Sequence, residues 1–329
     1  MKLNPFQVVV IHKNGRYSIY INFLKGRDKM KDVMIIANPS SGQKQAEDYA
    51  QQAKEILEAN GRFATINITE SGDDVVKFAQ EAARETYNTI IILGGDGTVS
   101  LLASSLKDED YRPEIAILPT GTVNNVARAL NIEINLDKAI KDLPNLTPQS
   151  IDAGLVNDQV FLSLVSTGTI PESVFEVNEE EKERLGPVAY LVEGIQALNK
   201  QKSYRFSLNI DNKVDEFELD LLLIGVSSSV VGLTNFFKDA SYNDGKLHIF
   251  GLKKTTLGDR VGSIANWIFD TEKVQNNGVL TVDAKNIKIE LLNKDVSTHV
   301  AVDGDKGPSF PVEISVLPNY INVLTPDQK

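Results

Sequence analysis

The chain of 329 residues contains no cysteine. It can therefore form neither disulfide bonds nor cysteine-ligated metal sites, a composition that suits a reducing cytoplasm. Its histidines, His12, His248 and His299, are scattered along the chain, which argues against a zinc cluster. No apolar run reaches the roughly 20 residues that a helix needs to span a bilayer. The N-terminus also lacks the small-residue cleavage site of a signal peptide. We therefore expect a cytoplasmic protein.

The chain is also short of positive charge. It has 34 Lys and Arg against 45 Asp and Glu, a net charge of −11. Binding to nucleic acid requires basic surface, so we expect no nucleic-acid partner. The same charge weakens any electrostatic attraction to anionic membranes. Apolar residues make up 42% of the chain, as in ordinary globular proteins, and its length favours two domains.

Residues 1–29 alternate between polar and apolar side chains around the pair Asn14-Gly15. Asn-Gly supplies the positive φ angles of a tight hairpin turn, so we expect an N-terminal β-hairpin ahead of the first domain. The aromatic residues of this segment leave two interpretations open, the extension of a sheet or a contact with a membrane or a second subunit.

Residues 30–148 predict an α/β domain with a parallel sheet. Four apolar runs, "VMIIAN", "FATINIT", "TIIILGG" and "EIAILPTG", alternate with segments of helical periodicity. Strands that alternate with helices form parallel, Rossmann-like sheets with helices on their faces. Residues 149–318 instead contain strands at hairpin spacing, which predicts a mainly antiparallel β-sandwich.

The segment "IIILGGDGTVS", residues 90–100, carries the most distinctive motif. In open α/β sheets, ligands bind outside the carboxyl ends of the strands. Glycines there let backbone N–H groups approach phosphate oxygens at a helix N-terminus. Asp96 would repel phosphate, so we interpret it as a partner of Mg²⁺ bound to that phosphate. The alternative is a plain turn with a capping aspartate.

Two further loops follow other strands of this domain. They are "NPSSG", residues 38–42, and "PTGTVNN", residues 119–125, and each offers glycine, hydroxyl groups and a helix start. Either loop alone could be merely structural. Three such loops at one edge of a sheet are the arrangement that a nucleoside triphosphate needs.

The order of these three motifs resembles the diacylglycerol kinase catalytic family, in particular its bacterial lipid kinases. NAD kinases and sphingosine kinases belong to the wider superfamily. The resemblance covers the chain from about residue 30 to its end, and it implies ATP and Mg²⁺ as cofactors. It also implies that a last strand, about 319–329, returns to the first domain. The implied nucleotide contacts are Asn38, Ser40, Ser41, Gly42, Thr69, Gly95, Asp96, Gly97, Thr98, Thr122 and Asn124.

Two motifs of the second domain take their meaning from this resemblance. "KDASYNDGKL" resembles a stretch that holds a structural Mg²⁺, which implies the Asp244 carboxylate and the carbonyls of Ser241 and Lys246 as ligands. Without the resemblance, "NDG" is a hairpin turn. "AVDGDKG" resembles a motif whose glutamate is the base for the lipid hydroxyl. That position is Asp305 here, with Asp303 beside it on the same strand face, and with Asp96 they form the expected catalytic set.

The chain departs from the family pattern at several positions. Ser100 and Leu101 replace an Asn-Glu pair, Asn125 replaces an aspartate, and Asp305 replaces the glutamate. Leu101 could point into the core, and Asp152 still matches an acidic position of the family.

We expect an ATP-dependent kinase that phosphorylates a lipid hydroxyl, with diacylglycerol as the first candidate. It would contact the membrane peripherally, and a homodimer is possible. A kinase of a soluble acceptor such as NAD, or a nucleotide- or lipid-binding regulator without activity, are the alternatives. The missing Asn-Glu pair argues against an NAD kinase.

Overall fold

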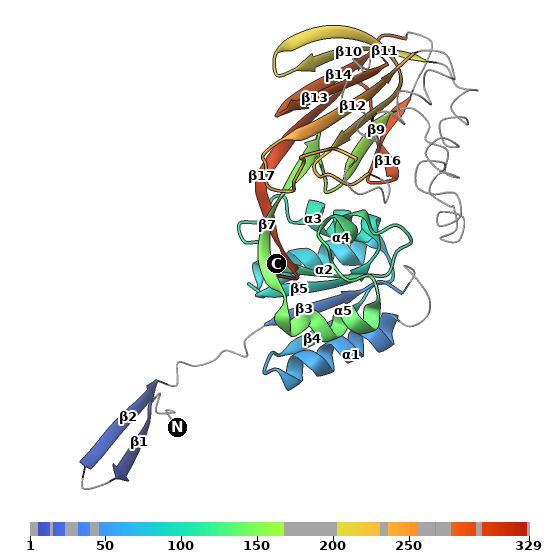
Figure 1. The fold of residues 1–329 in the computed structure, drawn as a ribbon. Helices are drawn as coiled ribbons and strands as arrows, with labels where there is room; N and C mark the ends of the chain where they lie inside the picture. The colour runs from blue at the N-terminus through green and yellow to red at the C-terminus, as the bar shows by residue number, and fades with distance from the viewer. Residues whose placement is uncertain are drawn as a thin grey trace.

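The computed structural model describes residues 6–13, 16–23, 32–39, 46–167, 203–230, 236–254, 267, 278–293 and 298–327, with the backbone alone for the first two ranges. Strands β1 (Phe6–Lys13) and β2 (Arg16–Phe23) pair antiparallel, with Lys13 opposite Arg16. They pair with no other described strand (Figure 1). This is the pairing expected of the N-terminal hairpin, although Asn14 and Gly15 lie outside the described residues.

The first domain is built on four parallel strands. These are β3 (Val33–Ala37), β4 (Ala64–Ile68), β5 (Thr89–Gly94) and β6 (Glu114–Pro119), in the order β6-β5-β3-β4. Every residue of β3 and β5 is buried, which explains their unbroken apolar runs. Alternate side chains enter two separate cores, because successive residues of a strand point to opposite faces.

Helices follow the strands as the sequence pattern predicts. They are α1 (Ala46–Ala59), α2 (Gly72–Arg84), α3 (Asp96–Ser105), α4 (Asn125–Ala129) and α5 (Leu136–Asp142), followed by the 3₁₀ turn η1 (Leu143–Asn145). In α1, Ala50, Ala53 and Leu57 form the buried stripe that faces the sheet. The start of α2 is stabilised by Asp74, whose carboxylate accepts the Ser71 N–H at 3.2 Å.

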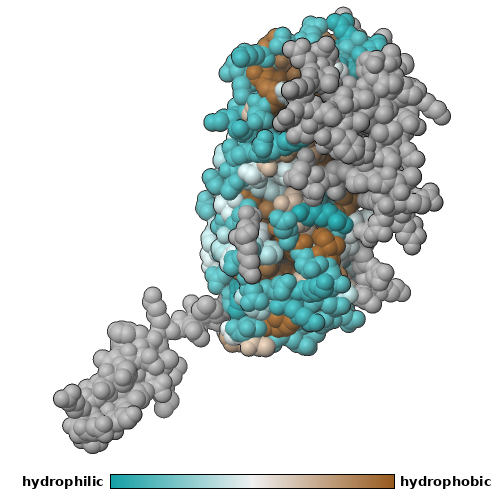
Figure 2. All heavy atoms as spheres, viewed as in Figure 1, coloured by the Kyte–Doolittle hydropathy of each residue, from teal (hydrophilic) through white to brown (hydrophobic). Residues whose placement is uncertain are grey.

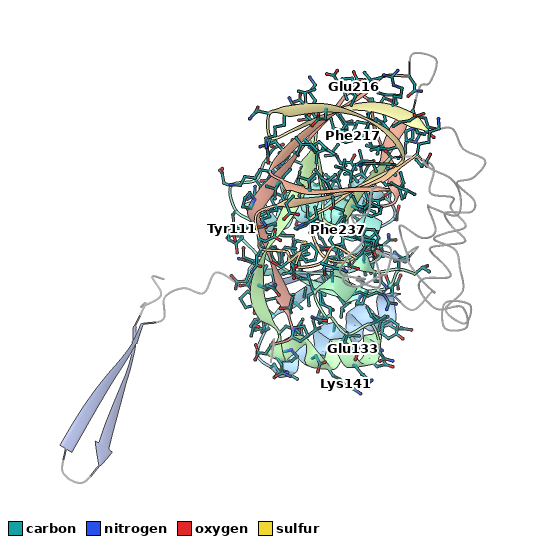
Figure 3. The ribbon with its side chains drawn as sticks, turned by 45° about the horizontal axis from the view of Figure 1, so that its top comes forward. Tyr111, Glu133, Lys141, Glu216, Phe217 and Phe237 are labelled. Atoms are coloured by element: carbon teal, nitrogen blue, oxygen red, sulfur yellow. The ribbon has the colours of Figure 1, made fainter. Side chains whose placement is uncertain are left out.

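The second domain is made of antiparallel strands. They are β7 (Thr147–Val156), β8 (Gln159–Phe161), β9 (Leu164–Thr167), β10 (Tyr204–Ile210), β11 (Lys213–Gly225), β12 (Leu247–Lys253), β13 (Val279–Ala284), β14 (Asn286–Leu291), β15 (His299–Val302), β16 (Asp305–Ser309) and β17 (Val312–Thr325). Figure 3 shows Glu216 and Phe217 of β11 at one end of the molecule, and Glu133 and Lys141 of the first domain at the other.

The long strand β17 joins the two domains. Its first part pairs with β14, most of its length pairs with β7, and Val323 pairs in parallel with Ile115 of β6. The chain thus returns to the first domain, as the family resemblance implies. Because β17 bridges the two sets of strands, all strands from β3 to β17 belong to one 15-stranded sheet.

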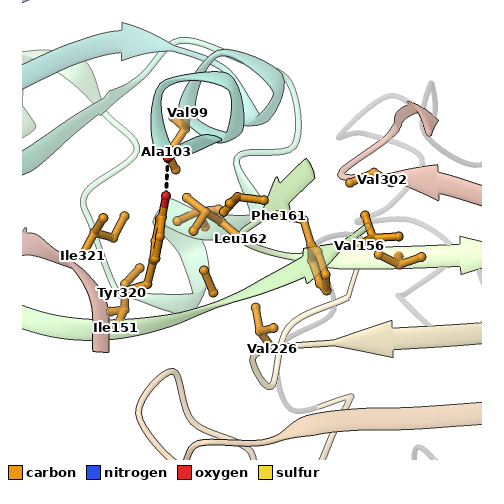
Figure 4. Close-up of a cluster of buried hydrophobic side chains, with 14 of the residues drawn as sticks. Val99, Ala103, Ile151, Val156, Phe161, Leu162, Val226, Val302, Tyr320 and Ile321 are labelled. Atoms are coloured by element: carbon orange, nitrogen blue, oxygen red, sulfur yellow. Dashed lines mark hydrogen bonds between the residues drawn. The ribbon is translucent and has the colours of Figure 1, made fainter. Parts of the chain in front are cut away.

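The cores of the two domains are also continuous. One buried cluster contains Ile90 and Leu102 of the first domain together with Leu222 and Ile289 of the second. Tyr320 of β17 lies in this cluster, and its hydroxyl donates a hydrogen bond to the Ala103 carbonyl of α3 at 2.8 Å (Figure 4). The visible described surface is mostly hydrophilic, with separate hydrophobic patches (Figure 2). The apolar contact between the domains holds the site described next in one arrangement.

Candidate active site

Three loops meet at the carboxyl ends of the parallel strands. Asn38, after β3, donates from its amide Nδ2 to Thr98 Oγ1 at 3.3 Å, and Thr120, after β6, donates its N–H to the Gly94 carbonyl at 3.1 Å. The start of the "NPSSG" motif therefore lies beside the "GGDGT" motif, and the "PTGTVNN" motif lies on its other side. Ser40, Ser41 and Gly42 of the first motif lie outside the described residues.

Glycines in two of these loops are needed for close contacts within the protein. A Cβ atom added to Gly121 would lie 2.6 Å from the Cα of Gly95, and one added to Gly94 would lie 2.6 Å from the Cβ of Thr98. Real Cβ atoms do not approach other atoms so closely. Two of the loops thus pack backbone against backbone at the start of α3, which brings the first N–H groups of the helix next to the neighbouring loop. That combination of backbone donors and a helix N-terminus suits phosphate.

Asp96 connects the central loop to the next helix. It is the first residue of α3, and its Oδ1 accepts the N–H of Val126 in α4 at 3.3 Å. Burial raises the pKa of Asp96, while amide donors of residues 124–126 and the charge of Arg128 act against that rise. The capping alternative therefore describes part of its role, because the carboxylate stabilises the start of a second helix.

Three other residues that were expected to contact the nucleotide lie in different environments. Thr122 is exposed on its loop. The hydroxyl of Thr69 is buried and donates to the Ala37 carbonyl at 3.3 Å, joining the ends of β4 and β3. Asn124 has a left-handed backbone, and its side chain donates to the Gly121 carbonyl at 2.7 Å and accepts the Gly121 N–H at 3.0 Å. Asn124 and Thr69 thus shape the loops, and their own contact with a nucleotide stays a prediction.

Asp305 brings the second domain to the central loop. It is the first residue of β16 and is exposed, and its Oδ2 lies 3.1 Å from where a Cβ on Gly97 would be. A carboxylate that is open to solvent and faces the "GGDGT" loop can accept a proton from a bound hydroxyl group. The glycine at position 97 leaves room for it.

The prediction that Asp303 lies on the same strand face as Asp305 was wrong. Asp303 does not share a strand face with Asp305, because Asp303 and Gly304 form the turn between β15 and β16, and Asp303 has a φ of 49°. Its carboxylate accepts the N–H groups of Leu162, Ser163 and Leu164 at 2.8–2.9 Å and the hydroxyl of Ser100. Burial raises the pKa of Asp303, and these hydrogen bonds act against the rise. Each of its two oxygens accepts two hydrogen bonds from the protein, which is the environment of a structural carboxylate.

Two residues of this region have roles that sequence reasoning missed. Ser100 is one of them, because its hydroxyl donates a hydrogen bond to Asp303, although the sequence shows it only as a departure from the family pattern.

Tyr242 is the other. It is buried, and its hydroxyl donates to the Leu162 carbonyl at 2.8 Å. Burial raises the pKa of Tyr242, as do the charges of Asp303 and Asp96. No local pattern marks such a tyrosine. Leu101 packs against the core, as expected.

The loop expected to hold a structural Mg²⁺ is closed by hydrogen bonds. The Asp244 carboxylate accepts the N–H groups of Ser241 and Lys246 at 3.1 and 3.0 Å, and His248 Nε2 lies 3.0 Å from it. The second ring nitrogen of His248 lies 3.0 Å from Asp283. Among the described residues, no group of three or more His, Asp or Glu side chains could hold a metal. The predicted ligands are one carboxylate and two backbone carbonyls, so this does not test them, and the Mg²⁺ at this loop stays a prediction.

Asp152 anchors the same loop to β17. Its carboxylate is buried and accepts the N–H of Gly245 at 2.7 Å and that of Asn319 at 2.8 Å. The acidic position that the sequence shares with the family therefore stabilises the second domain.

A parallel α/β sheet with glycine-rich loops, facing an exposed carboxylate from a β-rich domain, defines a two-domain kinase fold. Residues 32–156 match the diacylglycerol kinase catalytic domain, and residues 163–325 match the YegS C-terminal NAD kinase beta sandwich-like domain. The chain belongs to the diacylglycerol kinase catalytic family and is a lipid kinase. The predicted fold class is confirmed.

The similarity extends over nearly the whole chain. A diacylglycerol kinase from Bacillus subtilis is 30% identical over 301 residues, which cover 91% of this chain and 98% of that protein. A diacylglycerol kinase from Staphylococcus carnosus is 27% identical over 296 residues, covering 90% and 95%. The crystal structure of a diacylglycerol kinase from Bacillus anthracis aligns with a TM-score of 0.72 and 27% identity, covering 91% and 98%. No described helix is long and apolar enough to cross a membrane.

Proposed function

We propose that this protein transfers the γ-phosphoryl group of ATP to the hydroxyl of diacylglycerol, forming phosphatidic acid and ADP. The main support is that Asp305 of the second domain faces Gly97 of the nucleotide loop. Its Oδ2 lies 3.1 Å from the position that a Cβ atom on Gly97 would occupy. This proximity supports a role for Asp305 as the proton acceptor beside the expected phosphates. The names of the similar proteins from Bacillus and Staphylococcus support diacylglycerol as the acceptor.

In this mechanism Asp305 accepts the proton of the lipid hydroxyl while the hydroxyl oxygen bonds to the γ-phosphorus. The bond from that phosphorus to the β–γ bridging oxygen breaks, and ADP keeps the electron pair. Positioning and electrostatics do most of the work in such transfers. Mg²⁺, when bound beside Asp96, would neutralise phosphate charge. Asp96, Asn38 and Thr98 offer the oxygen atoms that such a hard cation accepts.

The shorter side chain of Asp305 does not by itself argue against activity. A displacement of about 1 Å at a reacting group can lower the rate roughly 100-fold. The absence of a Cβ at position 97 leaves room for the Asp305 carboxylate beside the loop, and this proximity supports aspartate as a working replacement for glutamate. The lipid is reached from the membrane surface, so the protein would bind the bilayer peripherally. The sequence also leaves open the formation of a homodimer.

The test is a kinase assay with radiolabelled ATP, Mg²⁺ and mixed micelles that contain diacylglycerol. We expect labelled phosphatidic acid from the wild-type chain and almost none from Asp96→Ala, while Asp305→Glu retains activity. Labelling of NAD or a sugar without lipid would instead indicate a kinase of soluble acceptors. Tight ATP binding without turnover, unchanged in the double variant Asn125→Asp plus Asp305→Glu, would indicate a regulator and overturn the proposal.

A further inference from the structure

We infer that Ser100 is a positioning residue, whose hydroxyl group sets the place of Asp305 against the "GGDGT" loop by holding Asp303. The inference rests on the proposed function, because it assumes that Asp305 accepts the proton. Ser100 itself is not expected to touch either substrate.

The first half of the link lies on α3. Ser100 follows Asp96 by four residues, so both side chains lie on one face of the helix, one turn apart. Ser100 is buried, and its hydroxyl donates to Oδ2 of Asp303. The same helix starts with Asp96 and Gly97, so any movement of Ser100 relative to Asp303 is also a movement of the nucleotide loop relative to the second domain.

The second half of the link lies in the turn between β15 and β16. The Asp303 carboxylate accepts three consecutive N–H groups of residues 162–164, and the Asp303 N–H donates to the Leu164 carbonyl at 2.8 Å. Val302 pairs with Asp305 directly across this turn. The turn is therefore anchored to β9 on one side, and the hydroxyl of Ser100 anchors it to α3 on the other.

Two contacts join α3 to the hairpin of β15 and β16. Ser100 meets Asp303, and Gly97 meets Asp305. The pairs are three residues apart on the helix and two apart on the hairpin. Loss of the Ser100–Asp303 hydrogen bond therefore leaves the hairpin anchored to β9 but removes a direct tie to α3 close to Asp305. Since a shift of about 1 Å at a reacting group lowers rates on the order of 100-fold, one hydroxyl can matter for turnover without touching a substrate.

The experiment compares Ser100→Ala with Ser100→Thr, which keeps a hydroxyl, and with Ser105→Ala. Ser105 is the matched control, because it lies on the same helix and its hydroxyl donates to the Leu101 carbonyl of that helix at 2.6 Å. We expect Ser100→Ala to lower kcat by roughly 10- to 100-fold, with the KM for ATP changed less than about twofold. Ser100→Thr should regain most of the rate, and Ser105→Ala should match the wild type. Thermal unfolding of each variant establishes that the assayed protein is folded.

A double-mutant cycle separates positioning from a general structural effect. If Ser100 acts through Asp305, Ser100→Ala should lower kcat by less than about threefold in an Asp305→Asn background, because the two losses overlap. A full loss in that background, or equal kcat for Ser100→Ala and Ser105→Ala, would overturn the inference while the proposed function stands. A wild-type chain that phosphorylates no lipid would overturn the proposed function and the inference with it.

Discussion

Gly95 and Gly121 touch through their backbones, and a Cβ on Gly121 would lie 2.6 Å from the Cα of Gly95. These glycines come from loops after neighbouring strands, β5 and β6. Their approach places the "GGDGT" and "PTGT" motifs in one surface, where an added methyl group would push the loops apart.

Gly121→Ala should therefore weaken the use of ATP. We expect kcat/KM for ATP to fall roughly 10- to 100-fold, because the loops must separate by a large fraction of an ångström at the phosphate site. Gly61→Ala is the control, since Gly61 has a φ of 80° with open space around it. That substitution should lower stability by about 1 kcal/mol through backbone strain and leave ATP kinetics unchanged. Equal kinetics for the two variants would contradict the proposed role of the contact.

Asp305→Asn should remove the proton acceptor while keeping the shape of the side chain. We expect kcat to fall about 100- to 10,000-fold, the range of general-base catalysis, with little change in the KM for ATP. Asp158→Asn serves as the control, because Asp158 lies in the turn after β7 and its side chain is fully exposed. Steady-state kinetics at saturating lipid measure both effects. Wild-type turnover by Asp305→Asn would show that another group accepts the proton.

Asp152→Ala should destabilise the whole second domain. The buried carboxylate accepts two backbone N–H groups, and both lose their partner in the variant. We expect the free energy of unfolding to fall by about 3 kcal/mol. Urea unfolding measures it, and Asp158→Ala should change it by less than about 0.5 kcal/mol. A similar small change for both variants would mean that the Gly245 and Asn319 amides find other partners.

The ion pair of Asp32 and Arg62 should make stability depend on pH. Arg62 donates to Asp32 at 3.0 Å and also to Thr89 at 2.9 Å. Burial alone would raise the pKa of Asp32, but the hydrogen bonds from Arg62 and Asn88 and the Arg62 charge hold it below its ordinary value of 3.8. The stabilisation is therefore present above the pKa of the unfolded chain, and it is lost as pH falls through the lower pKa of the folded chain.

Asp32→Asn is expected to lower the free energy of unfolding by less than about 1 kcal/mol at pH 7, because solvent screens part of the attraction between Asp32 and Arg62. That difference should shrink towards zero as pH falls through the lowered pKa of Asp32 in the folded chain. Denaturant unfolding between acidic and neutral pH measures it. Glu58→Gln is a control, because the Lys54–Glu58 pair is 3.8 Å apart on the exposed side of α1. A difference that grows towards acidic pH would have the wrong sign for this account.

Much of the fold was predictable from local patterns. The alternation of strands and helices, the parallel first sheet and the antiparallel second domain follow from hydrophobic periodicity, which each short segment carries by itself. The order of the three loop motifs identified the family, and Asp305 was found through it, whereas Asp96 was found from its place in the glycine-rich loop. Periodicity also indicated that Leu101 could face the core.

The roles of individual carboxylates were decided only by tertiary structure. Asp303 and Asp305 are alike in the sequence and two residues apart, but one is enclosed by backbone N–H groups and the other is exposed. The difference arises from contacts across the chain, since Ser100 and Asp303 are 203 residues apart. The sequence by itself determined which segments form strands, helices and loops, because those preferences are local. Which groups meet at the site depended on how β17 and the shared core join the two domains.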